Sequence, residues 1–379
     1  MHDTSSSESA QQIQMLRESA TDFVRGSTDM KRLRELRGTL PGYDPKLLRQ
    51  MAELGWFGIL VPEQQGGLAL GFAEMAVVLE ELGKGLLGEP MVATVLAARL
   101  LWHGANEALK ARLLPGLADG SALPCVAWQE GLGGLDTSSV RTTARAEGGS
   151  IVLDGGKRFV AGAAGAVGFI VSARSEAGLG LYWVDANAAG VTLRHETRAD
   201  ESPSGVLELA GVRVPAENVL SCAGREAQAA LERSLDEAAV MASAEMIGVM
   251  QAALQMALSY MRTRVQFGKP IGSFQALQHK AADLYVQQEL ARAVLNDAVR
   301  ELDSAASTEE RAKLASRCKA RSSDAGLRVT REVIQLHGAI GFTDEYDAGL
   351  YLKRALVLSG WLGNSSAHRR RFSQLTRGG

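Results

Sequence analysis

The sequence predicts an α+β multidomain protein in which helical regions precede and follow a β domain. Three observations support this prediction. Apolar residues recur at helical spacing in the first third, short β-prone runs separated by glycines fill the middle, and a long apolar stripe returns in the last third. This order indicates a C-terminal four-helix bundle beside a β barrel or sandwich. We therefore expect domains at residues 1–119, 120–222 and 223–379.

The first region has apolar side chains three or four residues apart, as at Leu47, Met51 and Leu54. This spacing places them on one face of a helix. The pattern breaks at residues 60–67, where Pro62 removes a backbone donor and two glycines permit positive φ. We expect a sharp turn there between helices.

The second region contains short runs rich in β-branched and aromatic residues, for example 150–153, 169–173 and 181–184. Glycine-rich turns separate these runs, which predicts a β domain. After residue 218 the glycine content falls, and Ile247, Met250, Leu254, Leu258 and Met261 lie on one helical stripe. Long bundled helices are expected in this third region.

The charge cluster from His368 to Arg371 is expected to be a solvated helix end. A formal charge of -2 gives no net positive field, which argues against nucleic-acid and membrane-surface roles. Cys125, Cys222 and Cys318 are far apart and odd in number, so we interpret them as small core residues in a reducing compartment, with no metal site. No run reaches about 18 uninterrupted apolar residues, and a cytoplasmic location is the default expectation.

Several motifs resemble signatures of the acyl-CoA dehydrogenase family. The matching stretches, in family order, are 54–58 (LGWFG), 61–63, 80–83 (EELG), 114–120, 212–215, 264–275 and 335–342 (QLHGAIGF). The most specific is Arg264 to Gln275, at its usual distance before Gln335. The resemblance implies an FAD-binding oxidoreductase acting on CH–CH bonds. It also implies a helical N-terminal domain, a middle β domain, a C-terminal four-helix bundle and a tetrameric assembly.

The resemblance assigns FAD contacts in two groups, of which the first is intact. In similar proteins, residues matching Arg264 and Phe267 reach into the FAD site of the adjacent subunit, and residues matching Gln335 and Gly338 line the adenosine part. A guanidinium at Arg264 suits a pyrophosphate because its planar fork pairs two phosphate oxygens. This chain is therefore expected to contribute to a neighbour's FAD.

The second group would hold the isoalloxazine ring, and here the sequence departs from the family. The family threonine and serine fall on Gln129 and Leu135. A later Trp-Ile-Thr element falls on Phe159, Val160 and Ala161. Three positions have thus lost the hydroxyl groups that hydrogen-bond the ring and tune its acceptance of hydride.

Dehydrogenation in the family needs a carboxylate that removes the α-proton while the β-hydrogen leaves as hydride. The two family positions for this base fall on Leu362 and Ala238, with Ala239 where an arginine is usual. Neither side chain can take a proton. Glu237 lies one residue off register, about 100° around the helix, and is the alternative candidate. The role of Glu245 is left open.

The residues donated to a neighbour's FAD are thus intact, whereas those for the chain's own flavin and substrate are degraded. This asymmetry suggests a heterotetramer with a base-bearing homologous subunit, as in bacterial acyl-CoA dehydrogenases of steroid side-chain breakdown. Residues 130–136 resemble the loosened flavin motif of those enzymes. The implied substrate is a bulky, steroid-derived acyl-CoA, and the usual acceptor is an electron-transferring flavoprotein. The alternatives are a self-sufficient homotetrameric acyl-CoA dehydrogenase, a non-catalytic scaffold or acyl-CoA-binding paralogue, and a flavin monooxygenase.

Overall fold

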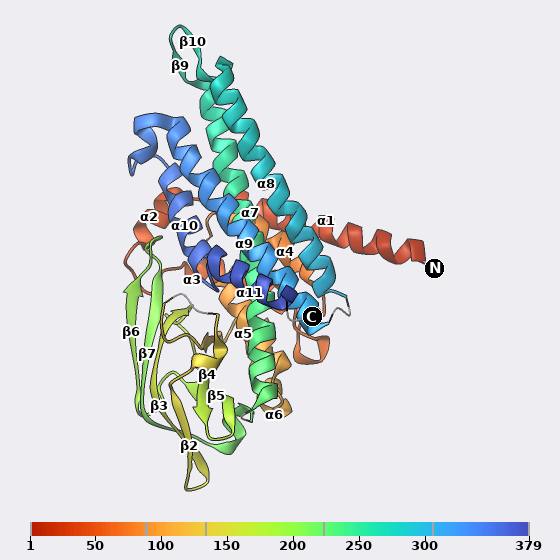
Figure 1. Cartoon of the computed structure of the whole chain (residues 1–379), viewed down its shortest axis with the longest axis vertical. Coiled ribbons are helices and arrows are strands. Elements are labelled where there is room, and N and C mark those ends of the chain that lie inside the picture. The colour runs from red at the N-terminus through yellow and green to blue at the C-terminus, as the bar shows by residue number, and fades with distance from the viewer. Residues whose placement is uncertain (1, 88–89, 133–134, 223, 305–306, 378–379) are drawn as a thin grey trace. The chain divides into compact units, whose positions relative to one another are not determined.

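The computed structural model describes residues 2–87, 90–132, 135–222, 224–304 and 307–377, with side chains from residue 10 onward. The chain divides into two compact units, each built from separate stretches of sequence (Figure 1). The first unit comprises Met1–Arg34, Phe72–Leu87 and Ala239–Gly379, and the second comprises Glu35–Gly71 and Gly88–Ala238.

The first unit is helical. Its elements are α1 (His2–Ser27), most of α2 (Met30–Leu36), α4 (Phe72–Lys84), most of α7 (Arg225–Thr263), the hairpin of β9 (Val265–Gln266) and β10 (Lys269–Pro270), η5 (Ile271–Ser273), α8 (Gln275–Leu302), α9 (Thr308–His337), η6 (Gly338–Phe342), α10 (Ala348–Gly360) and α11 (Ser365–Arg377). Helix α9 packs against α8, α10 and α11 (Figure 1). The predicted stripe is confirmed, because Ile247, Met250 and Leu254 are buried on α7.

Local sequence determines where the helices of this unit begin. The Ser307 hydroxyl accepts a hydrogen bond from the Glu310 backbone N–H, as a helix-capping serine does. Helix α4 is capped from a distant part of the chain, since the Asp303 carboxylate accepts hydrogen bonds from the backbone N–H groups of Phe72 and Ala73. A carboxylate there also opposes the positive end of the helix dipole.

The second unit combines helices with a sheet. Its elements are α3 (Pro45–Glu53), η1 (Trp56–Gly58), η2 (Glu63–Gln65), α5 (Met91–His103), α6 (Glu107–Ala118), β1 (Pro124–Ala127), η3 (Thr137–Ser139), β2 (Thr143–Glu147), β3 (Ser150–Ala161), β4 (Gly168–Ser175), β5 (Gly178–Asp185), β6 (Val191–Thr197), β7 (Pro203–Val214), η4 (Ala216–Asn218), β8 (Val219–Ser221) and the start of α7. The predicted turn at residues 60–67 contains η2, and Gly66 there has φ 81°.

The strands form one eight-stranded sheet in the order β6-β7-β3-β2-β4-β5-β8, with β1 pairing parallel to β4. The predicted runs at 150–153, 169–173 and 181–184 lie in β3, β4 and β5. Their inward side chains, such as Leu153, Phe169 and Val171, form the core of the unit. A bulge in β3 between Lys157 and Val160 shifts its register with β7.

The predicted order of helical, β-sheet and helical regions is confirmed. Helix gives way to strand between Ala118 and Pro124, and strand to helix between Ser221 and Arg225. The compact units, by contrast, join the first and last helices into one body. The three domain limits therefore stay a prediction about sequence segments.

Two expectations about single residues are wrong. Cys222 is exposed, because it follows the edge strand β8, whereas Cys125 and Cys318 are buried as expected. His368 is fully buried on α11 although its neighbours Arg369 and Arg370 are exposed, so the cluster is not uniformly solvated. Among the described residues, α7 is the one helix long and apolar enough to suit a membrane crossing, but 78% of its most apolar stretch is buried, as in a core helix.

Candidate functional site

The segment after β1 is organised around the carboxylate of Glu130. Its Oε1 atom accepts hydrogen bonds from Lys157 Nζ at 2.6 Å and from the backbone N–H and hydroxyl of Thr142 at 2.9 and 2.7 Å. Its Oε2 atom accepts from the Arg141 backbone N–H at 2.8 Å. One carboxylate therefore joins the β1 end, the 141–142 segment and strand β3.

The Glu130–Lys157 pair is held in the interior. Burial alone would raise the pKa of Glu130, but the hydrogen bond and charge of Lys157, with the Thr142 donors, lower it to about 2. Burial lowers the pKa of Lys157 to about 8, against the opposing effect of Glu130. Removing one member of such a pair would leave an uncompensated buried charge. The pair therefore holds the segment after β1 against strand β3.

The residues predicted to face an isoalloxazine ring lie beside this pair. Gln129 precedes Glu130, and its carbonyl accepts a hydrogen bond from the Arg158 backbone N–H at 2.8 Å, which draws the β1 end against β3. Phe159 lies in the β3 bulge at φ 57°, with the Arg158 guanidinium 5.1 Å from its ring centre. Ala161 is buried opposite Ser204 of β7. The structure thus brings Gln129 and Phe159 together.

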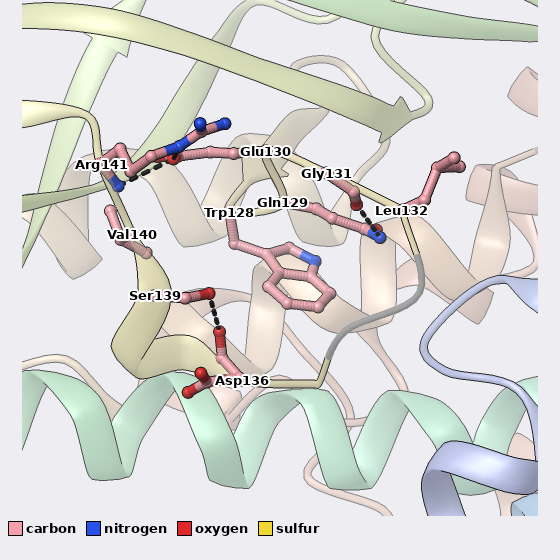
Figure 2. Close-up of a pocket in the computed structure, with 9 residues that line it drawn as sticks. All are labelled: Trp128, Gln129, Glu130, Gly131, Leu132, Asp136, Ser139, Val140 and Arg141. Carbon is pink, nitrogen blue, oxygen red and sulfur yellow. Dashed lines mark hydrogen bonds and ion pairs between the residues drawn. The ribbon is translucent and has the colours of Figure 1, made fainter.

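A pocket of about 300 Å³ lies within this segment (Figure 2). The residues that line it are Trp128, Gln129, Glu130, Gly131, Leu132, Asp136, Ser139, Val140 and Arg141. Gln129 Nε2 donates to the Gly131 carbonyl at 3.0 Å, and the Ser139 hydroxyl donates to the Asp136 carbonyl at 2.9 Å. These two side chains are therefore bonded to backbone carbonyls of the lining itself. Leu135, in place of the family serine, is half-buried nearby.

The residues predicted to hold a neighbour's FAD lie in the helical unit. We call Arg264 and the β9–β10 hairpin with Phe267 the dinucleotide arm. Arg264 directly follows α7, its side chain is exposed, and no described residue pairs with its guanidinium. Phe267 is 90% exposed at the tip of the β9–β10 hairpin. Phe267 and Gly268, the two loop residues, have φ 54° and 78°, the combination that a two-residue type I′ hairpin turn requires.

Gln335 and Gly338 lie at the end of α9, where Gly338 has φ 66° and donates its N–H to the Gln335 carbonyl. Both are exposed. Between them, His337 is buried, with its ring centre 4.6 Å from those of Tyr260 and Tyr346. Because Tyr260 lies one turn before Arg264, this aromatic contact brings the ends of α7 and α9 together. The four predicted dinucleotide residues thus share one end of the unit.

The first predicted base position, Leu362, lies in the turn between α10 and α11. The leucine is buried and has φ 59°, and its carbonyl accepts a hydrogen bond from His368 Nε2 at 2.8 Å. Below the turn, Lys319 Nζ is fully buried and donates to the carbonyls of Leu358 and Gly363 at 2.7 and 3.1 Å. The turn is firmly anchored, but it presents no carboxylate.

The second position, Ala238, is buried on α7 beside Glu237. Glu237 is 0% exposed, and its carboxylate accepts from Arg99 Nε at 2.7 Å, His103 Nε2 at 3.0 Å and Arg233 Nε at 3.1 Å. Burial alone would raise the pKa of Glu237, but His103 and Arg99 lower it to about 2. A carboxylate with this pKa and three donors is a poor general base at neutral pH.

The open question about Glu245 has a structural answer. Its buried carboxylate accepts from Arg354 Nε at 2.6 Å, which joins α7 to α10 within the helical unit. No group of three or more His, Cys, Asp or Glu side chains within the described ranges is placed to hold a metal ion.

The predicted dinucleotide contacts suit FAD better than the predicted isoalloxazine contacts do. Arg264 offers a guanidinium that no described residue pairs with, which suits a pyrophosphate, and Phe267 offers an exposed ring, which suits a flat ligand of another chain. The ring side fits FAD poorly, because the Gln129 and Ser139 side chains of the lining already donate to neighbouring carbonyls and the family hydroxyls are replaced by Gln129, Leu135 and Ala161.

Sequence reasoning missed the Glu130–Lys157 pair and the buried Lys319. A signal existed for the first, because Glu130 is retained where its neighbours depart from the family motif. No sequence signal marks Lys319, whose partners are the Ser323 hydroxyl and backbone carbonyls about forty residues further along the chain.

Three family models match successive parts of the chain. They are the acyl-CoA dehydrogenase N-terminal domain over residues 10–121, the middle domain over 125–212 and the C-terminal domain over 227–374. A curated relative, acyl-CoA dehydrogenase IpdE2 of Mycobacterium tuberculosis H37Rv, is 33% identical over 345 residues, which cover 90% of each chain.

Solved structures are similar over nearly the whole length. A variant of the Tcur3481–Tcur3483 steroid ACAD is 32% identical, with a TM-score of 0.86 and coverage of 97% of this chain and 98% of that one. The ChsE4–ChsE5 complex from Mycobacterium tuberculosis is 25% identical, with a TM-score of 0.87 and 97% coverage of both chains.

Proposed function

Because this chain belongs to the acyl-CoA dehydrogenase family, we propose that it is an FAD-dependent subunit whose catalytic base is supplied by a homologous partner chain. One observation carries the proposal. Both family base positions hold buried apolar side chains, Leu362 and Ala238, and the neighbouring Glu237 is bound by two arginines and a histidine. Loss of a general base lowers a rate by about 10² to 10⁴, so this chain alone would be a poor dehydrogenase.

The β9–β10 hairpin supports the proposal that this chain contacts the FAD of its partner. A phenylalanine at positive φ is strained, and its ring stays 90% exposed in this chain although its edge-to-face neighbour is Phe274. Both features are unfavourable in the isolated chain, which suggests that Phe267 contacts a second one. Arg264 and Phe267 would then hold the dinucleotide, with Gln335 and Gly338 beside the adenosine, and bound FAD would supply the hydride acceptor.

The partner and substrate follow from the relatives. The names of two similar structures each pair two proteins, and one names a steroid enzyme. We therefore assign this chain to a heterotetramer that dehydrogenates a bulky, steroid-derived acyl-CoA at its α and β carbons. An electron-transferring flavoprotein as acceptor and a cytoplasmic location complete the proposal.

A flavin spectrum tests this function. The chain is purified alone and after co-expression with a base-bearing homologue from the same host, and each sample is titrated with acyl-CoA. We expect flavin and its bleaching by substrate in the complex, and little of either in the chain alone. Stoichiometric FAD that acyl-CoA bleaches in the isolated chain would instead favour a homotetrameric enzyme. A complex that turns over no acyl-CoA would favour a non-catalytic scaffold or acyl-CoA-binding paralogue.

A further inference from the structure

We propose that Trp128 closes the isoalloxazine site of this chain, so that the chain contributes to flavin binding only through its partner. The inference rests on the proposed function and deepens it, because it names the side chain that excludes the ring. It concerns the pocket described above, at the end of β1.

The indole is the largest side chain that lines this pocket. Trp128 is 6% exposed, and Figure 2 shows its ring between the Gln129–Leu132 segment and the Asp136–Val140 segment. The volume that it leaves is about 300 Å³. This is the lower limit for small-molecule sites, which usually hold about 300 to 1,000 Å³. A tricyclic ring with a ribityl chain would need the space that the indole fills.

The backbone that carries the indole is anchored on both sides. The Trp128 carbonyl accepts a hydrogen bond from the Ser172 hydroxyl at 3.4 Å, and Ser172 is also bonded to Lys157 Nζ at 3.2 Å. The next two residues are tied to β3, Gln129 through its carbonyl and Glu130 through Lys157. The indole therefore cannot leave the pocket by a simple shift of this segment.

Two polar side chains of the lining, Gln129 and Ser139, already donate to neighbouring carbonyls. An isoalloxazine ring needs hydrogen bonds around N1, N5 and its carbonyls. The Gln129 amide instead donates to Gly131, and the Ser139 hydroxyl donates to the Asp136 carbonyl. These two side chains could serve a ring only if they gave up their present bonds. Arg264 differs from these side chains, because no described residue pairs with its exposed guanidinium and a ligand could bind it without breaking a bond.

Riboflavin binding tests the proposal, because riboflavin carries the ring without the dinucleotide that the arm would hold. The full chain, purified alone, is compared with Trp128→Leu by equilibrium dialysis against riboflavin. We expect at least tenfold tighter binding by Trp128→Leu than by the wild type. Trp102→Leu is the matched control, since Trp102 lies on α5, outside the pocket lining, and its loss should change nothing.

Side-chain size gives a second measurement in case the leucine variant folds poorly. Trp128→Phe and Trp128→Met fill more of the pocket, so their riboflavin affinities should lie between those of the wild type and Trp128→Leu. Equal affinity for the wild type and every folded Trp128 variant overturns the proposal. Tight riboflavin binding by the wild type also overturns it. Acyl-CoA turnover by the isolated chain would count against the proposed function, which this binding assay does not measure.

Discussion

The Glu237 side chain illustrates how one residue can resemble a catalytic group and act as a structural one. Its carboxylate neutralises charge between α5 and α7, where Arg99 and Arg233 approach it. We expect Glu237→Gln to lower the free energy of unfolding by about 3 to 5 kcal/mol, because it removes the charged member of the buried Arg99–Glu237 ion pair. Urea denaturation of the isolated chain measures this loss.

A matched control for that change is Glu208→Gln. Glu208 pairs with Arg194 on the exposed face of the sheet, where an ion pair contributes at most about 1 kcal/mol. If Glu237→Gln were as stable as Glu208→Gln yet abolished turnover by the chain alone, the structural interpretation of Glu237 would be wrong and a catalytic role would replace it.

His368 predicts a particular dependence of stability on pH. Burial lowers its pKa to about 3, and the charge of Lys319 adds to this, although the hydrogen bond to Leu362 opposes it. The ordinary value is 6.5, so between these values the unfolded chain binds a proton that the folded chain excludes. The contribution of His368 to stability is therefore full above about pH 6.5 and falls as the pH is lowered toward 3.

Replacing the imidazole by an amide isolates this effect. His368→Gln keeps a donor for the Leu362 carbonyl but cannot take up a proton. We expect the difference in melting temperature between wild type and variant to be constant above pH 7 and to shift in favour of the variant as the pH falls. A difference that stays constant down to pH 4 would contradict a buried, neutral His368.

Among the elements, α4 and α7 approach so closely that glycine is required at two places. A Cβ on Gly248 would lie 1.9 Å from the Glu80 carbonyl oxygen, and one on Gly83 would lie 2.3 Å from that of Glu245. Backbone atoms cannot move aside as a flexible side chain can. Gly248→Ala should therefore destabilise the chain by about 3 kcal/mol, near the upper end for overpacking.

The comparison variant is Gly349→Ala on α10, where a Cβ would meet nothing within 4 Å. Alanine is the better helix former by roughly 0.5 to 1 kcal/mol, so this change should raise stability slightly. Thermal unfolding of both variants measures the contrast. Equal effects of the two substitutions would show that α4 and α7 are not in close contact.

Local elements were predictable because their periodicity is local. The α7 stripe and the β3, β4 and β5 runs can be identified from spacing alone. The discontinuous units were not, because the Asp303 cap on α4 and the Gly248 contact join residues far apart in sequence. The buried His368 was missed for the same reason, since its environment is set by the turn at Leu362 and not by its arginine neighbours.

The parts of the candidate site whose chemistry depends on residue identity alone could be predicted from the sequence. Leucine and alanine at the base positions exclude proton abstraction in any fold. The state of a charged or aromatic residue depends on its neighbours, so the ion pairs of Glu237 and the filling of the pocket by Trp128 needed coordinates. The strain at Phe267 also needed them, because φ is a property of the hairpin and not of the residue alone.

At the scale of the whole molecule, the proposed function assigns FAD binding to the exposed Arg264 and Phe267 and not to the pocket beside Trp128. The assembled complex should therefore depend on Arg264 although the isolated chain does not. Arg264→Gln is expected to weaken FAD binding by the complex about 10- to 150-fold, which corresponds to the loss of a charged hydrogen bond of about 1.5 to 3 kcal/mol. Arg264→Lys should give a smaller loss, since an ammonium keeps the charge but not the planar fork.

Arg262→Gln is the control, because Arg262 is also exposed and lies in the last turn of α7. All three variants should melt at the wild-type temperature when purified alone, since no described residue pairs with the Arg264 guanidinium. Calorimetric titration of the apo complex with FAD measures the affinities. An Arg264→Gln complex that binds FAD as tightly as the Arg262→Gln complex would place the pyrophosphate elsewhere, and the arm would then have only an assembly role.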